Sequence, residues 1–96
     1  MSTRDEVLTF LRSNGETLRL SFSVRRIGLF GSVVRGTEGH GSDIDILVDL
    51  AEPTFDHYMD LKFFLEEHLG RPVDLVLADT LKPRLAPIIT REAVYA

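Results

Sequence analysis

Apolar residues occupy every second position between Asp43 and Leu50, and this alternation constrains the fold more than any other feature of the sequence. They are Ile44, Ile46, Val48 and Leu50. Because successive side chains of a β-strand point to opposite faces of the sheet, the pattern predicts a strand with one face in the core. The other face then carries three acids and one leucine, which are Asp43, Asp45, Leu47 and Asp49.

Helical and strand-like segments alternate along the rest of the chain. Thr3-x-x-Glu6 has the pattern of a capping box, and it predicts a first helix that ends at the Asn14-Gly15 pair. Similar signals predict helices over 16–22 and 54–69, a helical turn over 32–35, a short helix over 87–92, and strands over 24–30 and 73–78. We therefore expect one α+β domain over residues 1–96, a small α/β sandwich with a mixed sheet of three strands or slightly more.

Composition narrows the class of protein. The chain has 96 residues and no cysteine, so it has room for one small core and can form neither a disulfide nor a thiolate metal site. It lacks an apolar run of about 18 residues and an apolar signal segment, so we expect a cytoplasmic protein with no membrane span. The net charge of −4 argues against direct binding to nucleic acid, which needs a basic face.

Charge is unevenly distributed along the sequence. Residues 17–36 hold four arginines and no acid, whereas residues 37–67 hold nine acids and one lysine. Two solvated faces of opposite sign are one explanation of this separation.

Asp43 and Asp45 lie two residues apart on the predicted strand, so both carboxylates project from one face, with Cα atoms about 6.5–7 Å apart. Two like charges about 4 Å apart repel by roughly 4 kcal/mol at an effective dielectric constant of 20. Solvent, an arginine or a hard cation such as magnesium can offset that repulsion. Asp49 lies about 13 Å from Asp45, too far to join them. The alternative is a set of exposed aspartates without a function.

Asp74 is the third candidate carboxylate. In the segment "VDLVL" the apolar residues at odd positions face the core, so Asp74 points to the other face of a neighbouring strand, where it can meet Asp43 and Asp45. Three converging carboxylates can hold two divalent ions. That arrangement stabilises the attacking and leaving oxygens in phosphoryl or nucleotidyl transfer.

A Gly-Ser pair follows the strand predicted over residues 24–30. Gly31 allows a ligand to approach the backbone closely, and a helical turn opening at Ser32 presents free N–H groups to an anion. Arg35, one turn later, can add positive charge toward a triphosphate. A plain strand–turn–helix connection is the alternative. The chain has no G-x-x-x-x-G-K-[ST] motif and no G-x-G-x-x-G after a strand, which excludes a P-loop and gives no support for a dinucleotide fold.

Taken together, the segments "LFGSVVRG", "GSDIDILV" and "PVDLV" resemble the minimal nucleotidyltransferase family of the DNA polymerase β-like superfamily. The shared pattern is Gly31-Ser32, then Arg35-Gly36, then Ser42-Asp43-Ile44-Asp45, and Asp74 on a later strand. The resemblance covers nearly the whole chain. Val34 stands where alanine is more usual, a departure that concerns packing rather than chemistry.

The resemblance implies a nucleotidyltransferase fold and a role for each motif residue. Asp43, Asp45 and Asp74 would bind two magnesium ions, and Asp74 would help to deprotonate the acceptor hydroxyl. Gly31 and Ser32 would cradle the β- and γ-phosphates of ATP, and Arg35 and Ser42 would complete the nucleotide site. In-line attack on the α-phosphorus would transfer AMP and release pyrophosphate.

The resemblance also implies a partner. Family members of this size resemble antitoxins that form hetero-oligomers with a helical HEPN-type ribonuclease toxin and transfer AMP to one of its tyrosines. We expect the same activity here. One alternative is a binding module that neutralises its partner by occlusion alone, although such a module has no need of mutually repelling carboxylates. Another is transfer to a small molecule or a nucleic-acid end, which the acidic charge disfavours.

Overall fold

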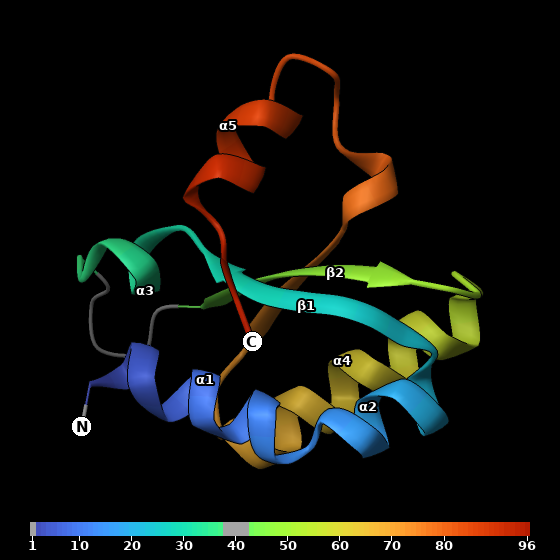
Figure 1. The fold of residues 1–96 in the computed structure, drawn as a ribbon. Helices are drawn as coiled ribbons and strands as arrows, with labels where there is room; N and C mark the ends of the chain where they lie inside the picture. Colours follow the sequence, from blue (N-terminus) through green and yellow to red (C-terminus); the bar gives the residue numbers. More distant parts are fainter. Residues whose placement is uncertain (1, 38–42) are drawn as a thin grey trace.

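The computed structural model describes residues 2–37 and 43–96, which form a four-stranded sheet with helices on both faces (Figure 1). The strands are β1 (Val24–Phe30), β2 (Ile44–Leu50), β3 (Val73–Leu77) and β4 (Val94–Tyr95), in the spatial order β3-β2-β1-β4. β1 pairs antiparallel with β2 and β4, and β2 pairs parallel with β3. The sheet is therefore mixed, as the sequence predicts.

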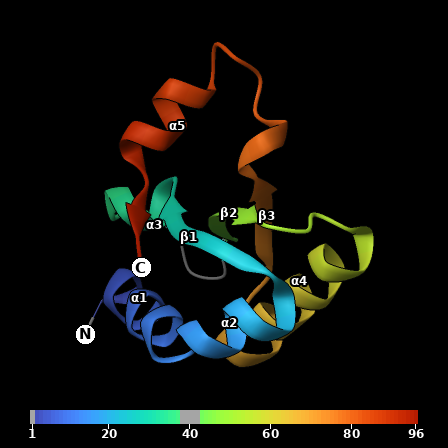
Figure 2. The ribbon, with the colours of Figure 1, turned by 45° about the vertical axis from the view of Figure 1, so that its right-hand side comes forward.

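Three helices cover one face of the sheet, and the carboxyl-terminal segment lies over the other (Figures 1 and 2). The first group comprises α1 (Thr3–Ser13), α2 (Gly15–Phe22) and α4 (Phe55–Leu69). The second comprises the 3₁₀ turn η1 (Ala78–Thr80) and α5 (Ala86–Glu92), and α3 (Ser32–Arg35) follows β1 directly. The core lies between the sheet and the first group, and it includes Val7, Leu11, Leu18, Leu29, Ile44, Ile46, Leu61, Leu65, Val73 and Leu75.

The alternation along β2 has the predicted structural result. Ile44, Ile46, Val48 and Leu50 are all buried in the core cluster. Leu47 belongs to the opposite face and is buried as well. With Ala78 and Thr90 it lines a hollow of about 110 Å³, so η1 and α5 close over this part of the face. Both faces of β2 are thus covered in its middle, and the acids lie toward its ends.

The first helix and the third strand differ in local detail from the sequence predictions, and several other boundaries move by one residue. The first helix is capped by Ser2, whose hydroxyl accepts a hydrogen bond from the Asp5 amide at 3.1 Å, rather than by a capping box at Thr3. Thr3 instead begins the helix itself. The third strand ends at Leu77, one residue early, because Ala78 starts η1. A fourth strand, β4, agrees with the expected sheet of three strands or slightly more, but no pattern in the sequence identifies its two residues.

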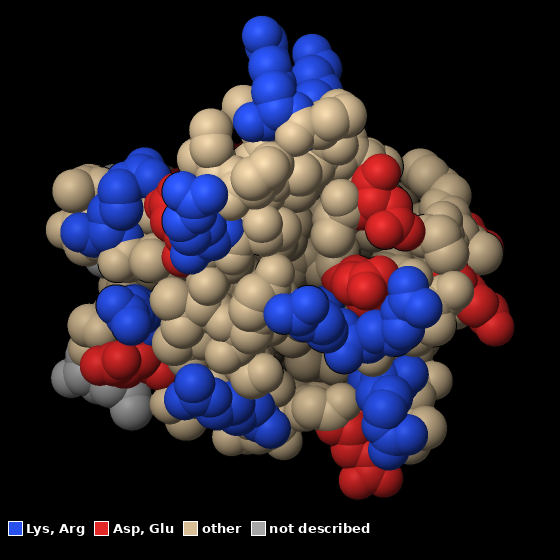
Figure 3. All heavy atoms as spheres, turned by 45° about the horizontal axis from the view of Figure 1, so that its top comes forward, with Lys and Arg blue, Asp and Glu red and all other residues tan. Residues whose placement is uncertain are grey.

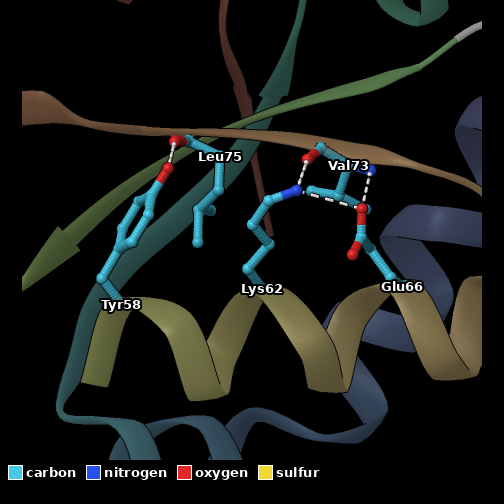
Figure 4. A network of polar contacts seen from close by, with 5 residues as sticks. All are labelled: Tyr58, Lys62, Glu66, Val73 and Leu75. Carbon is cyan, nitrogen blue, oxygen red and sulfur yellow. Dashed lines mark hydrogen bonds and ion pairs between the residues drawn. The ribbon is translucent and has the colours of Figure 1, made fainter. Parts of the chain in front are cut away.

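Side chains of α4 bind the outer backbone groups of β3, which is an edge strand (Figure 4). The Tyr58 hydroxyl donates to the Leu75 carbonyl at 2.6 Å, and Lys62 Nζ donates to the Val73 carbonyl at 2.9 Å. Glu66 Oε2 accepts from the Val73 amide at 2.9 Å and from Lys62 Nζ at 3.0 Å. These bonds cover an edge that would otherwise be open to another chain. They also hold β3, and with it Asp74, in register.

Charges that are separated in the sequence lie next to one another in the fold. β1 runs antiparallel to β2, which brings Arg25 to Asp49 with an N–O distance of 2.9 Å. Figure 3 shows acidic and basic side chains in neighbouring groups on the face of the molecule that carries α5. This face therefore carries charges of both signs rather than of one sign. Among residues 2–37 and 43–96, no helix is both long and apolar enough to traverse a bilayer.

Candidate functional site

Asp45 and Asp74 occupy paired positions on the neighbouring parallel strands β2 and β3. The flanking residues Ile44 and Val73 are buried in the core, so strand alternation directs both aspartates to the opposite face of the sheet. The two carboxyl groups interact, since the negative charge of Asp74 and a hydrogen bond to it both raise the pKa of Asp45. The structure thus brings together two of the three carboxylates that the sequence predicts to converge, although they come from segments 29 residues apart in the sequence.

The electrostatic surroundings of Asp45 disfavour its charged form. Partial burial is the largest cause that raises the pKa of Asp45, followed by the negative charges of Asp74 and Asp43 and by the hydrogen bond to Asp74. The positive charge of Arg35 acts in the opposite direction and is the smallest of these effects. Two neighbouring negative charges destabilise one another unless a cation or a proton lies between them. The site therefore favours binding of a proton or a cation.

Asp43 precedes β2 and is exposed. Its charge reaches Asp45, but the contact between Asp45 and Asp74 does not include it. No group of three His, Asp or Glu side chains among the described residues has the arrangement of a metal site. The three-aspartate metal centre therefore stays a prediction. The structure brings two of its residues together, Asp45 and Asp74.

Gly31 lies against Asp45, directly after β1. Its φ of 75° and ψ of −150° belong to a region that only glycine adopts readily. A Cβ atom built on Gly31 would overlap Asp45 Oδ2. The position therefore needs glycine for two reasons, the backbone conformation and the space that the Asp45 carboxylate occupies.

The turn after Gly31 is held by a residue from the other end of the chain. Glu92 Oε1 accepts a hydrogen bond from the Gly31 amide at 3.0 Å and from Arg35 Nη1 at 2.6 Å. Glu92 is the last residue of α5, 57 residues after Arg35. No pattern in the sequence marks Glu92 as a residue of this site, because no periodicity connects α5 with the glycine turn.

The other predicted residues that the structure describes lie at different distances from the Asp45–Asp74 pair along the chain and in the fold. Ser32 begins α3 directly after Gly31 and is partly buried. Arg35 ends α3, and its guanidinium is close enough to Asp45 to oppose the rise of its pKa. Ser42 lies outside the described residues. Asp49 belongs to the same face as Asp45 but pairs with Arg25, in agreement with its exclusion from the centre.

Known proteins resemble this chain over nearly its whole length. The family model described as "Nucleotidyltransferase domain" matches residues 5–96. The protein adenylyltransferase MntA of Thermococcus cleftensis is 44% identical over 96 residues, which are 99% of this chain and 97% of the relative.

Several solved structures share the fold, and two of them illustrate the similarity. One, described as a candidate minimal nucleotidyltransferase, has a TM-score of 0.80 and 37% identity, with 98% of this chain and 95% of that chain covered. The other is a toxin–antitoxin crystal structure with AMP-PNP, with a TM-score of 0.69 and 27% identity, covering 96% of this chain and 70% of that chain. The family model and the MntA relative extend over almost all of the sequence, including both aspartates and the glycine turn, so this protein belongs to the nucleotidyltransferase domain family.

Proposed function

We propose that this chain is a magnesium-dependent protein adenylyltransferase that acts as an antitoxin. It transfers AMP from ATP to a hydroxyl, that of a tyrosine, on a partner HEPN toxin with which it forms a hetero-oligomer. The name of the MntA relative supports the reaction, and the toxin–antitoxin structure with AMP-PNP supports the nucleotide and the class of partner. The observation in this chain that carries the proposal is the contact of Asp45 with Asp74 beside Gly31.

The donor set suits magnesium. Asp45 and Asp74 offer oxygen ligands, which hard cations prefer, and Asp43 adds a third negative charge that acts on Asp45. Their mutual repulsion gives a dication a direct energetic advantage, since it would neutralise charge that the fold holds together. Bound magnesium supplies Lewis-acid stabilisation of the negative charge on the attacking and leaving oxygens.

The protein's own groups have separate tasks in the transfer. Gly31 and Ser32 bind the β- and γ-phosphates, Arg35 and Ser42 complete the nucleotide site, and together they keep the α-phosphorus beside the carboxylates. Asp74, an exposed residue of the edge strand β3, takes the proton of the acceptor hydroxyl. The acceptor oxygen then bonds to the α-phosphorus as the bond from the α-phosphorus to the bridging oxygen breaks. AMP stays on the acceptor, and pyrophosphate leaves.

The test is to incubate the chain with magnesium, ATP and the product of the neighbouring gene, and to weigh the intact proteins. A gain of one or more AMP units on the partner is expected. Asp45→Asn should abolish that gain. Asp49→Asn should keep it, because Asp49 lies on the same face but pairs with Arg25. Tight complex formation without any gain in mass would replace the enzyme by the non-catalytic binding module.

A further inference from the structure

One carboxylate oxygen of Glu92 binds both groups that the proposed function assigns to phosphate. The Gly31 amide and Arg35 Nη1 each donate a hydrogen bond to Glu92 Oε1. A carboxylate oxygen and a phosphate oxygen are chemically similar acceptors for a backbone N–H and a guanidinium. Glu92 therefore meets the same donors that a β- or γ-phosphate oxygen would need.

We propose that Glu92 is a positioning residue that competes with the triphosphate. Without nucleotide, Glu92 holds the Gly31 turn and Arg35 in place. When the nucleotide binds, one of its phosphate oxygens displaces the Glu92 carboxylate. The inference rests on the proposed function for the identity of the ligand. It deepens that function by assigning the affinity for ATP in part to a residue of α5, far from the motif residues in the sequence.

The surroundings of this contact fit a displaceable ligand. The Arg35 side chain is 57% exposed and that of Glu92 is 26% exposed. Exposed ion pairs contribute little net free energy because water and salt screen them. A triphosphate carries more negative charge than one carboxylate, and it can therefore replace Glu92 at these donors.

The experiment measures binding by calorimetry in the presence of magnesium. AMP-PNP and inorganic tripolyphosphate are titrated into the wild type, Glu92→Gln and Glu92→Ala. Competition predicts that the affinity for both ligands rises from wild type to Glu92→Gln and again to Glu92→Ala. The total gain in affinity should be roughly threefold to tenfold, as expected for the loss of one exposed ion pair and one hydrogen bond. A purely structural role predicts the reverse order, because the turn would lose its support.

Asp49→Asn is the matched control. The Arg25–Asp49 pair has side-chain exposures of 58% and 28%, nearly those of the Arg35–Glu92 pair, and it also joins an arginine to a carboxylate. Its loss removes the same net charge and a similar contact, but away from Gly31. The affinities for AMP-PNP and tripolyphosphate should therefore stay within twofold of the wild-type values.

Affinities that are unchanged or weaker in both Glu92 variants would overturn the inference, as would the absence of polyphosphate binding in all three proteins. Thermal unfolding of each variant separates a folded protein from a misfolded one, and Glu92→Gln preserves the shape of the side chain. AMP transfer to the partner is read separately by mass. A chain that shows the predicted order of affinities but never transfers AMP would refute the proposed function and keep the inference.

Discussion

Gly31 and Asp45 lie so close together that a single added methyl group at Gly31 would overlap the Asp45 carboxylate. The glycine ends the turn from β1 into α3, and the aspartate belongs to the neighbouring strand β2, where its Cα partner is Phe30. The close approach means that the turn and the acidic pair form one site. A change in either element should therefore be felt in the other.

Gly31→Ala should destabilise the fold and displace the Asp45 carboxylate. The backbone conformation disfavours a side chain, and the added methyl group has no space. Gly36→Ala is the matched control, because Gly36 also has a positive φ, 72°, but a Cβ there meets nothing within 4 Å. We expect about 1–2 kcal/mol for Gly36→Ala, from strain alone, and a larger loss for Gly31→Ala. Urea unfolding measures both, and equal losses would contradict the close approach.

Asp45→Asn should stabilise the protein when no divalent cation is present. It removes a partly buried charge that Asp74 and Asp43 repel, and the relief of such repulsion commonly contributes about 0.5–2 kcal/mol. For a domain of this size, 1 kcal/mol corresponds to roughly 4–8 °C in Tm. Thermal unfolding with a chelator at neutral pH measures the effect. Asp49→Asn should act in the opposite direction, since it breaks the ion pair with Arg25. A lower Tm for Asp45→Asn would count against the repulsion.

Magnesium and ATP together should raise the Tm of the wild type, whereas ATP with a chelator should not. A ligand at 100 times its Kd stabilises the folded state by about 2.7 kcal/mol, which is well within the range of thermal unfolding measurements. Ser32→Ala should reduce the shift and leave the Tm of the free protein nearly unchanged, because Ser32 lies at the start of α3 beside Gly31. Equal shifts with and without the metal would argue against a magnesium site.

Glu66→Gln should make the stability less sensitive to acid. The Val73 amide and then Lys62 lower the pKa of Glu66 from 4.5. A lowered carboxyl pKa contributes stability that is present above the unfolded-state value and is lost as the pH falls through the folded-state value. The difference in unfolding free energy between wild type and Glu66→Gln should therefore be largest near neutral pH and shrink below pH 4.5. Glu67→Gln controls for the loss of one negative charge from α4. A difference that grows on acidification would contradict the assigned cause.

Much of the fold follows from periodicity within the sequence. Period two along Asp43–Leu50 predicts β2 and its buried face, and the helical spacing of Tyr58, Leu61 and Leu65 predicts α4, because burial selects the same spacing that backbone geometry imposes. The same alternation predicts that Asp45 and Asp74 leave the core on one side. β4 has no such signal, since two residues are too few to show a period.

The sequence by itself determined which residue types are present for nucleotidyl transfer and to which face of their strands they belong, because both follow from local spacing. Only the tertiary structure decided that β3 lies parallel to β2 with Asp74 opposite Asp45, and that Glu92 reaches Gly31 and Arg35. Strand order and contacts across 57 and 61 residues depend on how the whole chain packs. No local pattern carries that information, since the free energy of packing belongs to the assembled core rather than to any one segment.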